Sequence, residues 1–414
     1  MRIAVVGSGI AGLASARLLA REHEVTLYEA NDYLGGHTHT HDIEIDGRGH
    51  AVDTGFIVFN APHYPLLHKL FDELGVESQP TTMSFAVKNE RTGLEYNATN
   101  LPGLFCQRRN LVSPRFWCML RDLKRFYHEA PVLLDDAGEG PTLGEYLAAN
   151  SYSNAFTDDH LVPMACALWS SPSARILTFP AKYLVRFMAN HHMLQVAGRP
   201  QWRVVKGGSQ TYVRALRTGW RVRERIGCAA TRVTRAADGV TVQSAAGTER
   251  YDHAVLACHS DQALVLLGDA NEREREILGA MPFQENDTVL HTDANLLPRR
   301  RRAWAAWNAI VPRDDDAVCT VSYCMNLLQT LDCAQPIVVT LNRTAQIAPQ
   351  KILKRLRYQH PVYTHASVAA QKRKEQIQGV NRTWFAGAYW GWGFHEDGMR
   401  SAVDVANGLG VRWP

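Results

Sequence analysis

A strand, a glycine-rich turn and a helix follow one another at the start of the chain, and this order strongly constrains the fold. Residues 3–6 are apolar and mostly β-branched, as a buried parallel strand requires. Gly7, Gly9 and Gly12 follow with the spacing GxGxxG, and a helix is predicted over 10–21. The first glycine permits the tight turn, the second lets a pyrophosphate approach, and the third lets the helix pack closely. The segment therefore predicts a dinucleotide-binding Rossmann unit.

An acidic residue and a second glycine pair support this interpretation. A second strand is predicted over 25–28, and Glu29 ends it. A carboxylate at this position accepts hydrogen bonds from the adenosine ribose and repels the 2′-phosphate of NADP. Gly35 and Gly36 follow within the next turn. An isolated glycine-rich turn explains neither feature, and a secretory signal would need a basic leader without ordered glycines.

Length and composition indicate a two-lobed globular protein. The chain has 414 residues, more than one hydrophobic core usually fills, and 46% of them are hydrophobic against 21% charged. No apolar run of about eighteen residues is present, so we expect no membrane span. The eight cysteines lack CxxC spacing, which argues against a metal site or a redox dithiol. Without a secretory signal, reduced thiols in the cytoplasm are expected.

The net charge of +4 is modest, but basic residues cluster at 299–302, 351–357 and 372–374. Two interpretations stay open for these clusters. They are solvated surface, or they attract anionic lipid head groups at the inner face of a membrane. No nucleic-acid recognition motif accompanies them, so nucleic acid is not an expected partner.

The periodicity of the chain changes several times, which indicates one domain interrupted by another. Aromatic-rich stretches of helical period predict a helical lobe, and alternating residues farther along predict an antiparallel sheet. The expected fold class is α/β, a Rossmann-type dinucleotide-binding domain with an inserted mixed-sheet and helical (α+β) substrate domain. The dinucleotide-binding domain is predicted to consist of three separate segments, 1–60, 201–284 and 376–414. The substrate domain is predicted to consist of a helical lobe at 61–200 and an antiparallel sheet at 285–375.

The C-terminal region points to a flavin. A strand over 383–388 leads into a loop rich in Gly and Trp, and Gly398 is predicted to start a last helix over 399–409. A nicotinamide dehydrogenase needs no such second turn. A flavoprotein does, because its isoalloxazine lies away from the adenosine and needs its own helix N-terminus to stabilise negative charge.

These segments resemble the FAD-dependent amine oxidase, phytoene desaturase and protoporphyrinogen oxidase superfamily along most of the chain. The specific matches are VVGSGIAGLASARLLAREHEVTLYEANDYLGG and TWFAGAYWGWGFHEDGMRSA, with VVKGGSQTYVRAL as a weaker third. The chain also resembles a bacterial branch associated with the synthesis of modified fatty acids, through stretches such as HLVPMACALWSSP and FPAKYLVRFMANHHML.

The resemblance implies FAD as the cofactor, with Ala230 near the adenine and Met399 at the N1/O2 edge of the flavin. His37 stands where the superfamily often has an arginine that reaches the pyrophosphate, and it could donate one hydrogen bond but not a fork. No cysteine follows Cys333, so we expect non-covalent binding. The complete predicted cofactor set is Gly7, Gly9, Ile10, Ala11, Gly12, Glu29, Ala30, Gly35, Gly36, His37, Ala230, Gly387, Gly398 and Met399.

Four residues are candidates for catalysis. Amine oxidases of the superfamily commonly place a lysine near flavin N5, but the matching stretch here, 286–292, has none, and Asn286 is the nearest polar candidate. Trp390 and Trp392 could form a wall over the substrate or simply pack in a core. His395 could act as a base, or the segment HED could only shape the start of the last helix.

His37, His39 and His41 alternate, so a strand would place them on one side. A metal trio is conceivable, but packing beside the cofactor is the expectation, and no metal is predicted.

The expected activity is that of an FAD-dependent oxidase or desaturase, which removes a hydride from an apolar substrate such as a fatty acyl or other lipid chain. Only one dinucleotide fingerprint is present, so O₂ or a quinone is the expected electron acceptor. Two alternatives stay open: a flavin amine oxidase for a hydrophobic amine, and a non-catalytic flavin-binding partner of a lipid-modifying enzyme.

Overall fold

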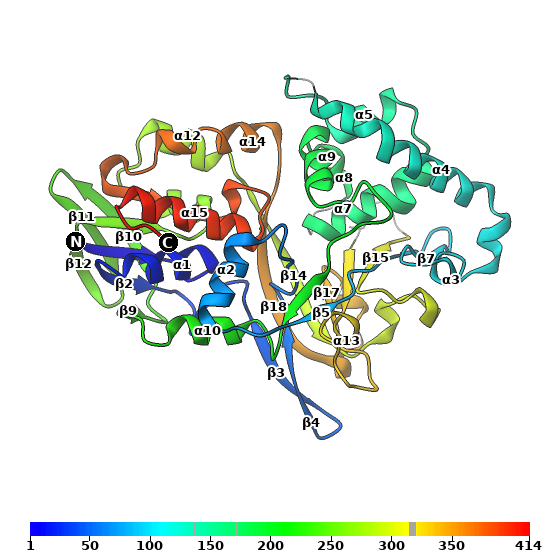
Figure 1. The fold of residues 1–414 in the computed structure, drawn as a ribbon, viewed down its shortest axis with the longest axis horizontal. Helices are drawn as coiled ribbons and strands as arrows, with labels where there is room; N and C mark the ends of the chain where they lie inside the picture. The colour runs from blue at the N-terminus through cyan, green and yellow to red at the C-terminus, as the bar shows by residue number, and fades with distance from the viewer. Residues whose placement is uncertain (136, 170–172, 314–319) are drawn as a thin grey trace.

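A computed structural model describes residues 1–135, 137–169, 173–313 and 320–414. Within these ranges, one large sheet lies at one end of the molecule, and another extends from the middle towards the other end (Figure 1). The α/β fold class predicted from the sequence, a Rossmann-type domain combined with a mixed-sheet and helical domain, is confirmed by this arrangement.

The first sheet is parallel and contains the N-terminal strand near its centre. In spatial order its strands are β19 (Thr383–Phe385), β13 (His253–Leu256), β1 (Arg2–Val6), β2 (Glu24–Tyr28) and β9 (Val222–Arg225). Alternate residues of β1 enter different cores, because neighbouring side chains of a strand point to opposite faces. Ile3 and Val5 belong to one core, and Ala4 and Val6 to the other.

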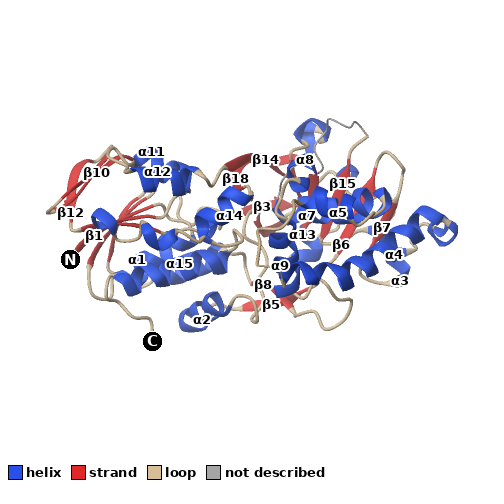
Figure 2. Ribbon diagram, turned by 90° about the horizontal axis from the view of Figure 1, so that it is seen from above, coloured by secondary structure: helices blue, strands red, loops and turns tan. Residues whose placement is uncertain are grey.

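Helices cover both faces of this sheet, as a parallel sheet requires. Figure 2 shows α1 and α15 on one side and α11 and α12 on the other. The helices of this region are α1 (Ile10–Leu19), α2 (Pro65–Leu74), α10 (Gln210–Arg217), α11 (Ser260–Leu266), α12 (Glu272–Gly279), α14 (His365–Gln371) and α15 (His395–Gly408).

The second sheet is mostly antiparallel, with β15 and β6 as a parallel pair. Its strands, in spatial order, are β18 (Ile352–Pro361), β14 (Phe283–His291), β17 (Val338–Leu341), β16 (Thr320–Cys324), β15 (Trp307–Val311), β6 (Phe85–Asn89) and β7 (Glu95–Asn97). The accompanying helices are α3 (Leu101–Leu104), α4 (Pro114–Glu129), α5 (Leu143–Ala149), α6 (Asn154–Phe156), α7 (Val162–Trp169), α8 (Ser173–Leu177), α9 (Ala181–Asn190) and α13 (Met325–Leu328).

Helix α4 illustrates how the local sequence determines where a helix begins and which face it buries. The Ser113 hydroxyl accepts a hydrogen bond from the Phe116 amide at 3.3 Å, and Pro114 occupies the first turn. A serine cap followed by proline is a favoured helix start. Phe116, Met119 and Phe126 are buried along one face, which attaches α4 to the second core. Among the described residues, no helix has both the length and the apolar composition needed to cross a bilayer.

Two predicted segments differ from the structure because strands pair over long distances. The segment 61–200, predicted as helical, also contains β5 (Ser78–Thr81), β6 and β7. Within the predicted segment 201–284, the strand before the glycines at 207–208 is β8 (Trp202–Val205), and it pairs with β5 rather than with the parallel sheet. The remaining strands form a hairpin, β3 (Thr40–Ile45) with β4 (Arg48–Asp53), and a small sheet of β10 (Ala230–Ala236), β11 (Gly239–Ser244) and β12 (Gly247–Tyr251).

Candidate functional site

The glycines of the first turn are needed for different structural reasons. A Cβ on Gly7, whose φ is +101°, would lie 2.8 Å from the Ala257 oxygen, and a Cβ on Gly12 would lie 1.9 Å from the Gly7 oxygen. These two positions are therefore fixed by packing within the protein. A Cβ on Gly9 would meet nothing within 4 Å. Gly9 thus faces open space at the start of α1.

The first turn of α1 is open to an anion. Gly9 caps the helix, and no side chain that the structure describes accepts hydrogen bonds from its first amides. The amides of a first helical turn lack partners within the helix, and they carry the positive end of its dipole. Ile10 and Ala11, both buried, follow at this end. Gly9, Ile10 and Ala11 therefore fit the diphosphate of a dinucleotide.

Glu29 lies beside this turn, at the end of β2. Its buried carboxylate accepts hydrogen bonds from the Ser8 amide at 2.9 Å and the Asn31 amide at 2.8 Å. The Ser8 hydroxyl and the Asn31 side-chain amide also donate to it. These four donors fill the usual acceptor positions of a carboxylate. A ribose hydroxyl can therefore bind Glu29 only if the Ser8 or Asn31 side chain turns away.

The second glycine pair packs directly against the first turn. A Cβ on Gly36, whose φ is +58°, would lie 3.0 Å from the Gly9 Cα. The Gly35 amide donates to the Ser8 carbonyl at 3.1 Å. Two segments that are separate in the sequence thus form one surface beside the start of α1.

Two other predicted residues flank the nucleotide end. Ala30 directly follows Glu29 and is exposed. Ala230 begins β10, two residues after Cys228, whose amide donates to the Glu29 carbonyl at 2.8 Å. Both positions lie close to the end of β2, and their contacts with an adenine remain a prediction.

His37 is turned towards the second sheet. Its ring lies 5.0 Å from Tyr358 and 5.3 Å from His360, measured between ring centroids. Burial and the neighbouring histidines lower the pKa of His37 well below its ordinary value, so the ring is neutral. Its Nε2 is buried and has no hydrogen-bond partner among the described residues. These contacts favour a role for His37 as a neutral polar group that faces β18. They do not favour the expected role, in which His37 takes the place of an arginine at the pyrophosphate.

Asn286 is buried on β14 and contacts His360, a residue that was not among the predicted site residues. Its Nδ2 lies 2.8 Å from Nδ1 of His360, and its Oδ1 accepts a hydrogen bond from Asn342 at 2.7 Å. Burial, with a smaller effect of His259, lowers the pKa of His360 to about 4. Asn286 therefore orients a neutral imidazole beside His37. Only the pairing of β14 with β18 brings these residues together.

The remaining histidines of the predicted trio contact aromatic neighbours. His39 stacks on Tyr33 with ring centroids 4.0 Å apart, and His41 lies 4.1 Å from His39. The Nδ1 of His39 lies 3.1 Å from the Tyr358 hydroxyl. Among the described residues, no group of three or more candidate ligands could hold a metal ion.

Trp390 and Trp392 lie in different clusters, so they do not form one wall. The Trp390 indole donates to the Phe385 carbonyl at 3.1 Å, and its ring packs on Tyr389 in the nucleotide-binding half. Trp392 instead contacts Phe187 and Tyr183 of α9. It belongs to what we call the aromatic cluster, which comprises Trp169, Tyr183, Phe187, His191, Tyr363, Trp392 and Phe394.

His395 anchors the start of α15. Its ring stacks on Phe56 with centroids 3.6 Å apart, and its Nε2 lies 3.1 Å from the Thr38 hydroxyl and 3.2 Å from the Tyr212 hydroxyl. Burial lowers the pKa of His395 to about 3. A neutral ring engaged in this way favours a structural role over that of a base.

The two acidic residues after His395 also shape this turn. Glu396 accepts hydrogen bonds from the amides of Leu66 and Leu67, each at 3.0 Å, at the start of α2. Asp397 accepts from the amides of Trp392 at 3.0 Å and Phe394 at 3.1 Å. Both carboxylates are therefore committed to backbone groups.

The last helix begins at His395, so the predicted start at Gly398 is wrong by one turn. The Gly398 amide donates to the Phe394 carbonyl at 3.2 Å, inside the helix. Met399 is buried in the core that α1 shares. In this first turn the amides of His395 and Glu396 have no hydrogen-bond acceptor among the described residues. Gly387, whose amide donates to the Ser401 hydroxyl at 2.9 Å, joins β19 to the same helix.

Substituting Gly398 with valine is expected to separate α15 from α1. A Cβ at Gly398 would lie 2.6 Å from Cγ2 of Ile10. Overpacking of this kind costs about 1–3 kcal/mol, and it would displace the open amides of α1. Chemical denaturation should show a lower free energy of unfolding, and flavin titration should show a lower affinity for the flavin. The control is Gly49→Val, because a Cβ at Gly49 meets nothing within 4 Å. Equal behaviour of the two variants would contradict the close packing at Gly398.

Comparison with known proteins agrees with this geometry. A zeta-carotene desaturase of Synechocystis is 38% identical over 78 residues, which are 19% of this chain and 15% of the relative. A 15-cis-phytoene desaturase of Glycine max is 26% identical over 217 residues, 48% of this chain and 36% of the relative. The chain thus matches less than half of the length of either desaturase.

Solved structures share the fold over nearly the whole chain. A fatty acid isomerase from P. acnes that produces CLA has a TM-score of 0.67 at 18% identity, covering 99% of this chain and 98% of that one. Cyclohexylamine oxidase from Brevibacterium oxydans has a TM-score of 0.67 at 17% identity, covering 99% of each chain. The family model for flavin-containing amine oxidoreductases matches residues 10–280. With its glycine turn, its second glycine pair and this match, the chain belongs to the flavin-containing amine oxidoreductase family.

Proposed function

We propose that this protein is an FAD-dependent oxidoreductase that removes a hydride from an apolar substrate, namely a fatty acyl or other lipid chain. The observation that carries the proposal is the uncapped start of α1, where Gly9 faces open space and Gly36 packs beside it. When bound, FAD would supply the hydride acceptor. Gly9, Ile10 and Ala11 would hold its diphosphate, and the first amides of α15 would stabilise negative charge nearby.

The aromatic cluster supports an apolar substrate. Its rings come from α9 and the residue after it, from the loop before α15, and from Trp169 of α7 and Tyr363 after β18. Burial lowers the pKa of its one histidine, His191, to about 4. The nearby carboxylates of Glu396 and Asp397 are engaged with backbone amides. A substrate ammonium would therefore have to compete for them, whereas an acyl chain would not. This balance favours a lipid over a hydrophobic amine.

We propose that FAD is bound non-covalently and that O₂ or a quinone reoxidises the reduced flavin directly. The last cysteine in the sequence is Cys333, so the C-terminal motif 383–402 has no thiol for a link to the flavin. A single glycine fingerprint gives no separate place for a nicotinamide cofactor. Acid precipitation of the purified protein should therefore release free FAD.

Anaerobic mixing tests the substrate class. Fatty acyl substrates with methyl or cyclopropane modifications should bleach the flavin absorbance rapidly, while a panel of hydrophobic amines should not. Bleaching by amines alone would favour the amine oxidase alternative. If neither panel bleaches a flavin that dithionite reduces normally, the flavin-binding partner of a lipid-modifying enzyme is the better description.

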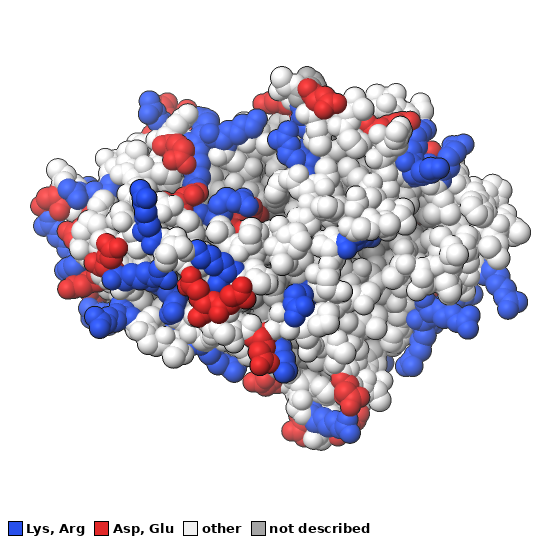
Figure 3. Space-filling view, viewed as in Figure 1, with Lys and Arg blue, Asp and Glu red and all other residues white. Residues whose placement is uncertain are grey.

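We also propose peripheral contact with a membrane surface. Leu101, Leu111, Val112 and Trp117 are 50–82% exposed around α3 and the start of α4. Figure 3 shows Lys and Arg side chains above and below an uncharged area at this end of the molecule. Exposed apolar residues with a tryptophan, flanked by basic residues, are typical of proteins that lie on anionic membranes.

A further inference from the structure

A basic cavity is lined by the β6–β7 hairpin, the segment 107–109, the loop 299–300 and Arg313. Figure 1 shows β7 at the end of the molecule away from α1. Its volume is about 530 Å³, within the range of small-molecule sites. Five of the residues that line it are cationic, and two are acidic. The cationic residues are Lys88, Arg109, Arg299, Arg300 and Arg313.

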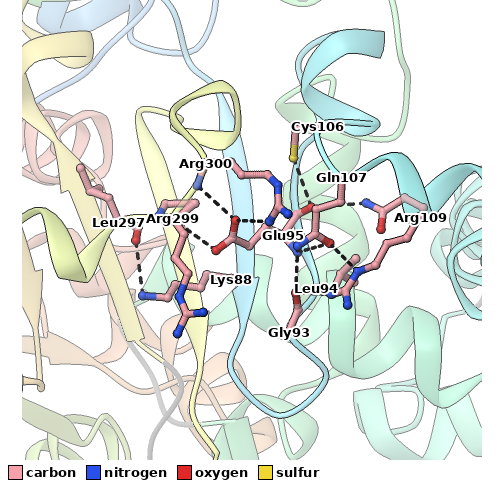
Figure 4. A network of polar contacts seen from close by, with 12 residues as sticks. Lys88, Gly93, Leu94, Glu95, Cys106, Gln107, Arg109, Leu297, Arg299 and Arg300 are labelled. Carbon is pink, nitrogen blue, oxygen red and sulfur yellow. Dashed lines mark hydrogen bonds and ion pairs between the residues drawn. The ribbon is translucent and has the colours of Figure 1, made fainter.

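The two carboxylates are already neutralised by contacts on the protein. Glu95 is buried and accepts hydrogen bonds from the backbone amides of Arg299 at 2.8 Å and Arg300 at 3.3 Å, as Figure 4 shows. It also forms an ion pair with the Arg300 side chain at 3.5 Å. Glu90 pairs with Arg343, which does not line the cavity, at 3.1 Å. Both carboxylates therefore already have arginine partners.

The lysine of the cavity is held among oxygen atoms. Lys88, whose side chain is 13% exposed, lies 3.8 Å from Glu90. It donates hydrogen bonds to the carbonyls of Asn295 at 2.7 Å and Leu297 at 3.3 Å. These contacts fix the ammonium group at the cavity wall.

Three arginines of the lining contact neutral groups or nothing among the described residues. Arg109 donates to the Gly93 carbonyl and to the Gln107 side chain at 3.3 Å. The guanidinium groups of Arg299 and Arg313 have no hydrogen bond or ion pair with any residue that the structure describes. The described lining therefore carries more positive charge than its two carboxylates balance, and an anion would complete it.

We propose that this cavity binds the phosphate group of an organic phosphate. Guanidinium forks match phosphate oxygens with paired hydrogen bonds, and a largely buried lysine adds a point charge. The volume exceeds that of a bare ion, so it leaves room for the organic moiety. The phosphate can belong to a soluble ester or to a lipid headgroup. The described lining of the cavity contains no residue of α1, and binding there does not depend on the redox reaction.

The test measures two probes on the purified flavoprotein: glycerol 3-phosphate in solution, and phosphatidylcholine vesicles with and without phosphatidylglycerol. Arg299→Gln should weaken saturable binding by about ten- to a hundredfold, the usual effect of losing a charge-assisted hydrogen bond. Arg302→Gln removes an equal charge from the same basic run, outside the cavity lining, and should change binding less than about threefold. Saturation with glycerol 3-phosphate identifies a soluble source, and binding only to phosphatidylglycerol vesicles identifies a lipid source.

Two results would overturn the inference. One is no saturable binding of either probe, and the other is equal weakening by Arg299→Gln and Arg302→Gln, which would indicate general surface charge. Thermal unfolding of each variant checks that it is folded. If Arg299→Gln is unfolded, Arg109→Gln takes its place, with the same expected loss.

Discussion

Gly9→Ala is expected to lower the affinity for FAD by about ten- to a hundredfold, because it removes close approach of the diphosphate to the first amides of α1. The flavin-free protein should keep its stability, since the new Cβ would meet nothing within 4 Å and the φ of −62° suits alanine. Fluorescence titration of the flavin-free protein with FAD measures the first effect. Urea unfolding of the same preparation measures the second.

Two matched glycines make this result specific. Gly49→Ala, also without a neighbour for its Cβ, should change neither quantity. Gly12→Ala should instead destabilise the protein itself, because its Cβ would lie 1.9 Å from the Gly7 oxygen. Unchanged FAD affinity in Gly9→Ala would show that the diphosphate does not lie at this turn.

Arg235→Leu is expected to cost about 3–5 kcal/mol of stability, the typical penalty for removing one partner of a buried ion pair. The side chains of Arg235 and Glu274 are 2% and 0% exposed, and the guanidinium contacts both oxygens of Glu274, at 2.5 and 2.9 Å. Asp269 completes the group at 2.8 Å. The variant would leave Glu274, in the first turn of α12, charged and without its arginine partner. Urea denaturation of variant and parent measures the loss.

An exposed ion pair provides the contrast. Arg250 and Asp238 also form a salt bridge, but their side chains are 57% and 70% exposed. Arg250→Leu should therefore lower the free energy of unfolding far less than Arg235→Leu does. A similar loss in the two variants would mean that burial does not govern the strength of the Arg235 contact.

The regions of the site that could be predicted are those in which neighbouring residues in the sequence are also neighbours in space. The GxGxxG turn, α1 and Glu29 form one continuous strand–turn–helix–strand unit, so spacing alone located them. The contact between Gly36 and Gly9 follows from the same unit, because only a short loop separates Glu29 from the second pair.

The residues that could not be predicted depend on long-range pairing. His360 and Tyr358 reach the site only because β18 pairs with β14 along its length. No local pattern in 352–361 indicates that its histidine, His360, will be buried beside His37. Likewise β6 pairs with β15, more than 200 positions later, so a strand forms within the segment 61–200 that was predicted to be helical.

The start of α15 differs from the prediction for another reason. Glycine is a common marker of a turn, which is why the sequence places the helix start at Gly398. In the structure Asp397 accepts hydrogen bonds from the amides of Trp392 and Phe394, which closes the turn earlier. Gly398 is then required by the approach of Ile10, a tertiary contact that its neighbours in sequence do not reveal.

The order of the strands in the parallel sheet has a consequence for the timing of assembly in the cell. The glycine turn at residues 7–12 leaves the ribosome early, but β19 and α15, which pack beside β13 and α1, are made only after residue 382. At roughly 5–20 residues per second, the intervening stretch takes about 20–75 s to synthesise. During that interval the apolar face of α1 lacks its partner. We therefore expect nascent chains to need chaperone protection, and the cofactor to be acquired only after translation has passed α15.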